Sequence, residues 1–119
     1  VFFDFRKAFD KVDRGKLLRK MSQKGIPDYL VFAMKSLLTK TSINTQGVEI
    51  PTFQGTPQGA KLSPTQFNFF SNDLLTELNS IFGVEALAFT DDLTTICSDQ
   101  FKAEKAIQCV LDWSARNNL

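Results

Sequence analysis

Phe89-Thr90-Asp91-Asp92 joins two short β-prone runs, residues 84–89 before it and residues 93–97 after it. This pattern predicts a tight hairpin with two adjacent acidic residues at its tip. At an effective dielectric constant of about 20, two like charges about 4 Å apart repel by about 4 kcal/mol. The pair is therefore either a solvated turn, since Asp is a common turn residue, or part of a site for a hard divalent cation such as Mg²⁺.

A third acidic residue lies in the apolar run that opens the sequence, Val1-Phe2-Phe3-Asp4-Phe5. A run that is apolar on both faces predicts a buried central strand. A carboxylate in such a strand costs several kcal/mol unless it is paired, protonated or bound to a metal. If this strand lies beside the hairpin, a cation is what would let Asp4, Asp91 and Asp92 all stay ionised.

Size and composition limit the classes of protein that fit. The 119 residues make one domain at most, and 43% hydrophobic residues suffice for a core. Both ends look cut, so we expect a piece of a longer protein. No apolar run approaches the roughly 20 residues of a membrane span, so no membrane partner is expected. Two cysteines without any histidine argue against a zinc site and favour reduced thiols in an intracellular protein, nuclear or cytoplasmic.

Charge is distributed unevenly along the sequence. Residues 1–24 contain eight basic and three acidic side chains, whereas the remainder contains six basic and ten acidic ones. A basic segment suits a polyanionic partner and an acidic remainder suits cation binding, although a solvated helix face explains most single lysines equally well.

The middle of the sequence predicts two helices and a hairpin. The first helix has Asp10 or Asp13 as its N-cap and Gly25 as its C-cap. The second covers residues 29–38 after Pro27, with apolar side chains at helical spacing. The hairpin turns at Gln46-Gly47.

A turn-rich loop, residues 54–64, precedes a third helix. Its two glycines allow backbone to approach a ligand closely, although such a loop is more often a plain connection. We expect Ser63 as the cap, Pro64 at the first position and Gln66 in a capping box. The expected core stripe of this helix is Phe67, Phe70, Leu74, Leu75 and Leu78.

A last helix, residues 101–117, is expected to begin after Asp99 as its cap. Its apolar face is predicted to consist of Ala103, Ala106, Ile107, Val110, Leu111 and Ser114.

Taken in order, residues 2–12, 55–64 and 89–92 resemble motifs A, B and C of reverse transcriptases, most strongly those of non-LTR retrotransposons and group II introns. Residues 112–119 look like the start of motif D. The resemblance implies an α+β polymerase palm, an antiparallel sheet packed on helices. It makes residues 1–119 a partial reverse transcriptase domain, without the N-terminal part of the fingers and without the thumb.

The resemblance also implies roles for single residues. Asp4 and Asp91 would be the main ligands of two Mg²⁺ ions, with Mn²⁺ as a possible substitute, Asp92 the second acid of motif C and the Phe5 carbonyl an additional ligand. The residues expected to contact the nucleotide are Arg6, Lys7, Ala8, Phe9, Gln58 and Gly59. Among them, Phe9 would lie under the incoming sugar and exclude a ribose 2′-hydroxyl, or else belong to the core. Asp10 is expected to cap or brace.

The implied function is RNA-directed DNA polymerisation, in which dNTPs are added to a DNA primer 3′-hydroxyl on an RNA template. Fingers and thumb segments of a longer chain would be partners, and this segment alone is expected to be inactive. One alternative is a palm that has lost its chemistry and serves as a scaffold for RNA or protein. Another is a viral-type RNA-dependent RNA polymerase, which usually has Gly before the acidic pair and a smaller or polar group at the position of Phe9.

Overall fold

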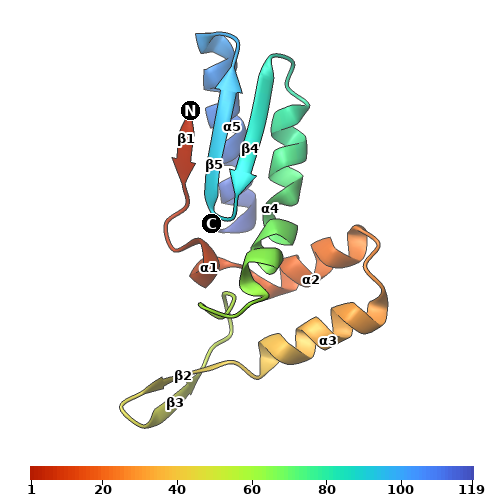
Figure 1. Cartoon of the computed structure of the whole chain (residues 1–119), viewed down its shortest axis with the longest axis vertical. Helices are drawn as coiled ribbons and strands as arrows, with labels where there is room; N and C mark the ends of the chain where they lie inside the picture. The colour runs from red at the N-terminus through yellow and green to blue at the C-terminus, as the bar shows by residue number, and fades with distance from the viewer.

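The computed structural model describes residues 1–119 and contains five helices and five strands. Figure 1 shows a sheet backed by two long helices, with a helix and a hairpin extending away from it. This confirms the α+β class. In chain order the elements are β1 (Phe2–Asp4), α1 (Ala8–Lys11), α2 (Arg14–Gln23), α3 (Asp28–Thr39), β2 (Ser42–Thr45), β3 (Val48–Pro51), α4 (Ser63–Asn79), β4 (Val84–Phe89), β5 (Asp92–Cys97) and α5 (Gln100–Asn117).

The main sheet has the order β1-β5-β4 and is antiparallel throughout. The predicted hairpin is confirmed as β4 and β5, with Phe89 opposite Asp92 and a two-residue turn between them. The run at the start of the chain is an edge strand, however, and not the predicted central one. Phe2 is 86% exposed and Asp4 is exposed as well. An all-apolar run looks the same whether both its faces are covered or only one, and here β5 takes the central position.

The core lies between the sheet and the two long helices. α4 contributes the buried Phe67, Phe70, Leu74 and Leu78, which confirms the predicted stripe apart from the half-buried Leu75. α5 buries Ala106, Val110, Trp113 and Asn117. The predicted apolar face of α5 is therefore only partly right: Ala106 and Val110 are buried, but Ile107 and Leu111 are exposed. Trp113, the only tryptophan of the chain, decides the orientation because it packs on both Phe5 and Phe70.

Helix ends follow local chemistry at three of the predicted sites. Asp13 caps α2 by accepting from the Lys16 amide at 2.9 Å, and Asp99 caps α5 by accepting from the Lys102 amide at 2.9 Å. Gly25, at φ 82°, follows α2 as predicted, with its amide bonded to the Ser22 carbonyl.

The predicted cap of α4 is wrong. Ser63 is the first helical residue and its hydroxyl donates to the Pro57 carbonyl, so the side chain ties the helix to the preceding loop. Gln66 makes no capping box, because its side chain is buried and its amide nitrogen lies 2.8 Å from the Met34 sulfur.

The helix α3 and the hairpin β2–β3 form where predicted, yet they bury little. Of the apolar residues of α3 only Leu38 is buried, and every residue of β2 and β3 is exposed. No helix of the chain combines the length and apolar composition that a membrane crossing requires.

Candidate functional site

The sheet brings two of the three predicted carboxylates together. β1 and β5 pair so that Asp4 lies directly opposite Asp92, and Asp91 precedes Asp92 in the hairpin turn. Val1 and Thr95 exchange two main-chain bonds, of 2.6 and 2.8 Å. Because such pairs alternate along an antiparallel ladder, Asp4 and Asp92 form a non-hydrogen-bonded pair, the kind whose side chains approach most closely.

These carboxylates lie on the face of the sheet that the helices do not cover. Alternation buries Leu93 and packs Phe3 against the core, so their neighbours Asp92 and Asp4 point the other way. A hollow of about 410 Å³ lies at the paired strands β1 and β5 and is lined by residues 2–4 and 92–94. The carboxylates are thus open to a ligand from solution.

Exposure changes the electrostatic argument. An exposed carboxylate keeps its hydration, so setting Asp4 opposite Asp92 costs less here than it would in the core. The prediction that Asp4 would be buried is wrong, because the helices cover only the opposite face of the sheet.

The donor set fits a hard cation by its chemistry. Carboxylate oxygens are the ligands that Mg²⁺ takes from proteins, usually one or two of them together with water and phosphate. The facing pair supplies two carboxylates and Asp91 a third. In the structure, however, no group of three or more acidic or cysteine side chains is arranged to hold a metal ion. The Asp91 carboxylate is instead half-buried and accepts from the Thr90 hydroxyl at 2.9 Å.

Thr90 is held in an unusual conformation at the tip of this hairpin. Its φ of 55° lies in the left-handed region, which is rare for a β-branched residue. The conformation turns the chain within two residues, and the hydroxyl then reaches the next side chain. Thr90 therefore shapes the turn and orients Asp91.

The segment after Asp4 carries the residues predicted to contact a nucleotide. Arg6 and Lys7 are exposed, whereas the side chain of Ala8 is 2% exposed and points into the core, so only its backbone is left for a ligand. The Phe5 carbonyl accepts from the Ala8 amide at 3.2 Å, so one of its lone pairs is already used. Phe9 is half-buried, with its ring centroid 5.3 Å from that of Phe67.

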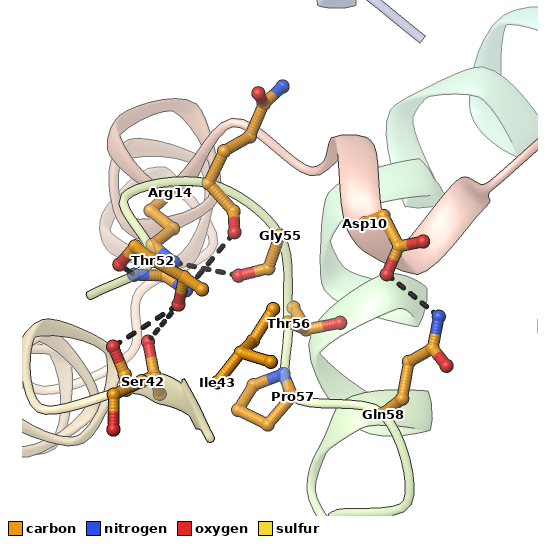
Figure 2. A pocket seen from close by; sticks show the side chains of 11 residues that line it. Asp10, Arg14, Ser42, Ile43, Thr52, Gly55, Thr56, Pro57 and Gln58 are labelled. Atoms are coloured by element: carbon orange, nitrogen blue, oxygen red, sulfur yellow. Dashed lines mark hydrogen bonds between the residues drawn. The ribbon is translucent and has the colours of Figure 1, made fainter. Parts of the chain in front are cut away.

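The loop before α4 is bonded directly to this segment. The Gly55 amide donates to the Val12 carbonyl and the Thr56 amide to the Phe9 carbonyl, both at 2.8 Å. Asp10 accepts from the Gln58 side-chain amide at 2.8 Å, as the dashed line in Figure 2 shows. Asp10 is therefore a brace rather than a cap.

Gly55 is required by this close approach. Its φ is 81°, and a Cβ at this position would lie 2.6 Å from the Asp10 carbonyl oxygen. Gly59, at φ 78°, has no heavy atom within 4 Å of the corresponding point, so it faces open space next to Gln58. The two glycines of the loop thus serve two different purposes.

Beside the loop lies a hollow of about 640 Å³, shown in Figure 2. Its lining includes Arg14, a residue that the sequence analysis did not single out. Arg14 is the first residue of α2, where the helix dipole disfavours a positive charge. A positive charge at this helix end was the signal in the sequence that the Arg14 guanidinium binds groups outside α2.

Comparisons with known proteins agree with the motif order. A family described as reverse transcriptase (RNA-dependent DNA polymerase) matches residues 1–119. A Pol polyprotein of the type-1 retrotransposable element R2 from Popillia japonica is 36% identical over 107 residues, covering 78% of this chain and 18% of that protein. The corresponding R2 protein from Nasonia vitripennis is 30% identical over 108 residues, covering 81% of this chain and 10% of its own length. The chain thus spans less than a fifth of these relatives.

Proposed function

This chain belongs to the reverse transcriptase family, and we propose from that membership that it forms the palm of an RNA-directed DNA polymerase. The palm would extend a DNA primer with dNTPs on an RNA template. The observation that carries the proposal is the register that sets Asp4 opposite Asp92 next to a turn made by Asp91.

Asp4, Asp91 and Asp92 are the residues that would hold Mg²⁺, with the Phe5 carbonyl as an additional ligand. Two such ions supply activation of the primer hydroxyl and stabilisation of the leaving pyrophosphate. The exposed Arg6 and Lys7 provide positive charge for a triphosphate next to the carboxylates. Gln58 is fixed by Asp10, and Gly59 leaves room beside it for a base or sugar.

The test is primer extension by the full-length protein on an RNA template with Mg²⁺ and dNTPs. Asp91→Asn keeps the size of the side chain but removes its charge, and we expect a loss of at least 10²-fold in rate, the order of effect of removing a group that stabilises transition-state charge. Glu104→Gln is the control, because Glu104 is exposed on α5, outside the three motifs, and its carboxylate accepts only from the Gln100 side chain. Full activity of the Asp91 variant contradicts the proposal.

A scaffold without chemistry is the second candidate, and it is favoured by the absence of a three-residue metal group among these side chains. Titration with Mn²⁺, followed by water proton relaxation, separates the two functions. A polymerase palm binds Mn²⁺, and Asp4→Asn weakens that binding. A scaffold shows the same relaxation with and without the substitution.

Phe9 is proposed to exclude ribonucleotides. In Phe9→Val the smaller side chain would admit a 2′-hydroxyl, and the ratio of kcat/KM for dNTPs over rNTPs would fall at least tenfold. An unchanged ratio would assign Phe9 to the core alone, where it already contacts Phe67. Efficient rNTP use by the unsubstituted protein would favour an RNA polymerase.

A further inference from the structure

Arg14 makes five hydrogen bonds from one guanidinium. Its Nε donates to the Gly55 carbonyl at 2.7 Å, and Nη1 donates to the carbonyls of Leu38 and Thr52 at 2.7 and 2.6 Å. Nη2 donates to the Thr52 hydroxyl and to the Gln54 carbonyl, both at 3.1 Å. One side chain therefore joins α2 to the end of α3 through Leu38, and to the loop through Thr52, Gln54 and Gly55. Figure 2 shows Arg14 among these loop residues.

No carboxylate neutralises this charge. The ion pairs of the chain are Lys20–Asp73 and Arg116–Glu77, and every acceptor of Arg14 is a main-chain carbonyl or a hydroxyl. Desolvation lowers the pKa of Arg14, although a guanidinium stays protonated. The Leu38 carbonyl lies in the last turn of α3, where the helix dipole favours a cation. The charged guanidinium of Arg14 therefore serves mainly to hold main-chain carbonyls in place.

The backbone that it holds leads directly to Gln58. On one side Gly55 accepts from Arg14, and on the other its amide donates to Val12. Gly55 is therefore fixed from both directions, with no room for a Cβ. Beyond it lie Thr56, bonded to Phe9, and then Gln58, bonded to Asp10.

We infer that Arg14 is a positioning residue, which sets where Gln58 and Gly59 stand relative to α1 and so controls how tightly the site binds the incoming nucleotide. This inference rests on the proposed function. All five hydrogen bonds of Arg14 go to protein atoms, so its effect on the nucleotide would pass through Gly55. A planar fork can serve several carbonyls at once, whereas Lys offers a single nitrogen, so Arg14→Lys restores only part of the effect.

The first experiment needs no catalysis. Hydrogen exchange of the full-length protein is compared with that of Arg14→Met and of Arg19→Met, a matched control since Arg19 is exposed on the same helix. In Arg14→Met we expect the amides of Gly55 and Thr56 to exchange at least tenfold faster while amides of α4 and α5 keep their rates. Unchanged protection of Gly55 and Thr56 overturns the inference.

The second experiment is steady-state primer extension. In Arg14→Met we expect KM for dNTP to rise about tenfold, because displacement of positioning groups weakens the bound geometry. KM for the primer–template should stay within about twofold, and Arg14→Lys should lie between Arg14→Met and the unsubstituted protein. Equal KM values for dNTP in Arg14→Met and Arg19→Met overturn the inference. If the unsubstituted protein makes no product, the proposed function fails, and the exchange experiment still decides whether Arg14 holds the loop.

Discussion

Replacing Gly55 with alanine tests whether the loop before α4 is seated on α1 as the structure describes. At φ 81°, the left-handed conformation destabilises alanine by about 1–2 kcal/mol. Its Cβ would also lie 2.6 Å from the Asp10 carbonyl oxygen and 2.9 Å from the Asp10 carbonyl carbon. Overpacking of this kind costs about 1–3 kcal/mol, because backbone cannot swing aside as a flexible side chain can.

An opposing effect comes from the unfolded chain. Alanine has fewer unfolded conformations than glycine, and the lower entropy of the unfolded chain stabilises the folded state by about 0.4–1 kcal/mol. The net loss expected for Gly55→Ala is therefore about 2–4 kcal/mol in the free energy of unfolding.

Gly59→Ala is the matched control for this loss. Gly59 lies in the same loop at φ 78°, but nothing surrounds the position of its Cβ. It should lose only the conformational part, about 0.5–1 kcal/mol. The difference between the two variants isolates the contact with Asp10, at about 2 kcal/mol.

Urea denaturation of both variants measures this difference. A slope of about 1–3 kcal/mol per molar urea converts 2 kcal/mol into a midpoint about 1 M lower for Gly55→Ala than for Gly59→Ala. Equal midpoints would mean that Gly55 does not approach Asp10, and would refute the seating of the loop. In primer extension, Gly59→Ala should weaken dNTP binding by steric obstruction, whereas Gly55→Ala should weaken it by displacing the loop that carries Gln58.

Two further substitutions test the hairpin and the last helix. Thr90→Asn should raise the free energy of unfolding by about 1 kcal/mol in a urea titration, because Asn adopts positive φ more readily than a β-branched residue; a loss of stability would show that the hydroxyl bond to Asp91 outweighs the strain. The backbone bond from Lys102 keeps the pKa of Asp99 below its usual value, so this cap stabilises the fold above the unfolded pKa of about 3.9 and loses that contribution as pH falls through the lower folded pKa. Thermal unfolding below about pH 4 should therefore depend less on pH in Asp99→Asn, which still caps, and an unchanged acid dependence would contradict this role.

Local chemistry allowed much of the fold to be predicted from sequence. Asp13 and Asp99 cap helices, and Gly25 ends one, because these residues satisfy orphan backbone groups with atoms a few positions away. The hairpin turn at Gln46-Gly47 formed because both residues take the positive φ values, 53° and 83°, that a two-residue turn of this kind requires. Such features depend little on the rest of the molecule.

Most of the wrong predictions concern residues whose position depends on a partner far away in the sequence. The position of β1 at the edge depends on which strands pair with β5, and no feature of residues 1–5 specifies that. Gln66 was expected to complete a capping box on α4, but its amide contacts the Met34 sulfur on α3, 32 positions away. Ser63 is the exception, since it bonds to Pro57 only six positions earlier. Arg14 was missed because its four acceptor residues lie 24 to 41 positions away.

The packing of the core, more than any charge interaction, determines where the candidate carboxylates stand. Complete burial of an apolar side chain contributes about 1.5–3 kcal/mol, a value that Leu93 approaches and the partly buried Phe3 shares in part. The exposed Asp4 and Asp92 stay hydrated, so their repulsion opposes the fold less. A slip of one residue between β1 and β5 would turn Phe3 outward and Asp4 into the core, which loses the first contribution and adds the cost of a buried carboxylate. The register is therefore fixed before any ion binds, and the two acids meet as a consequence of how their apolar neighbours pack.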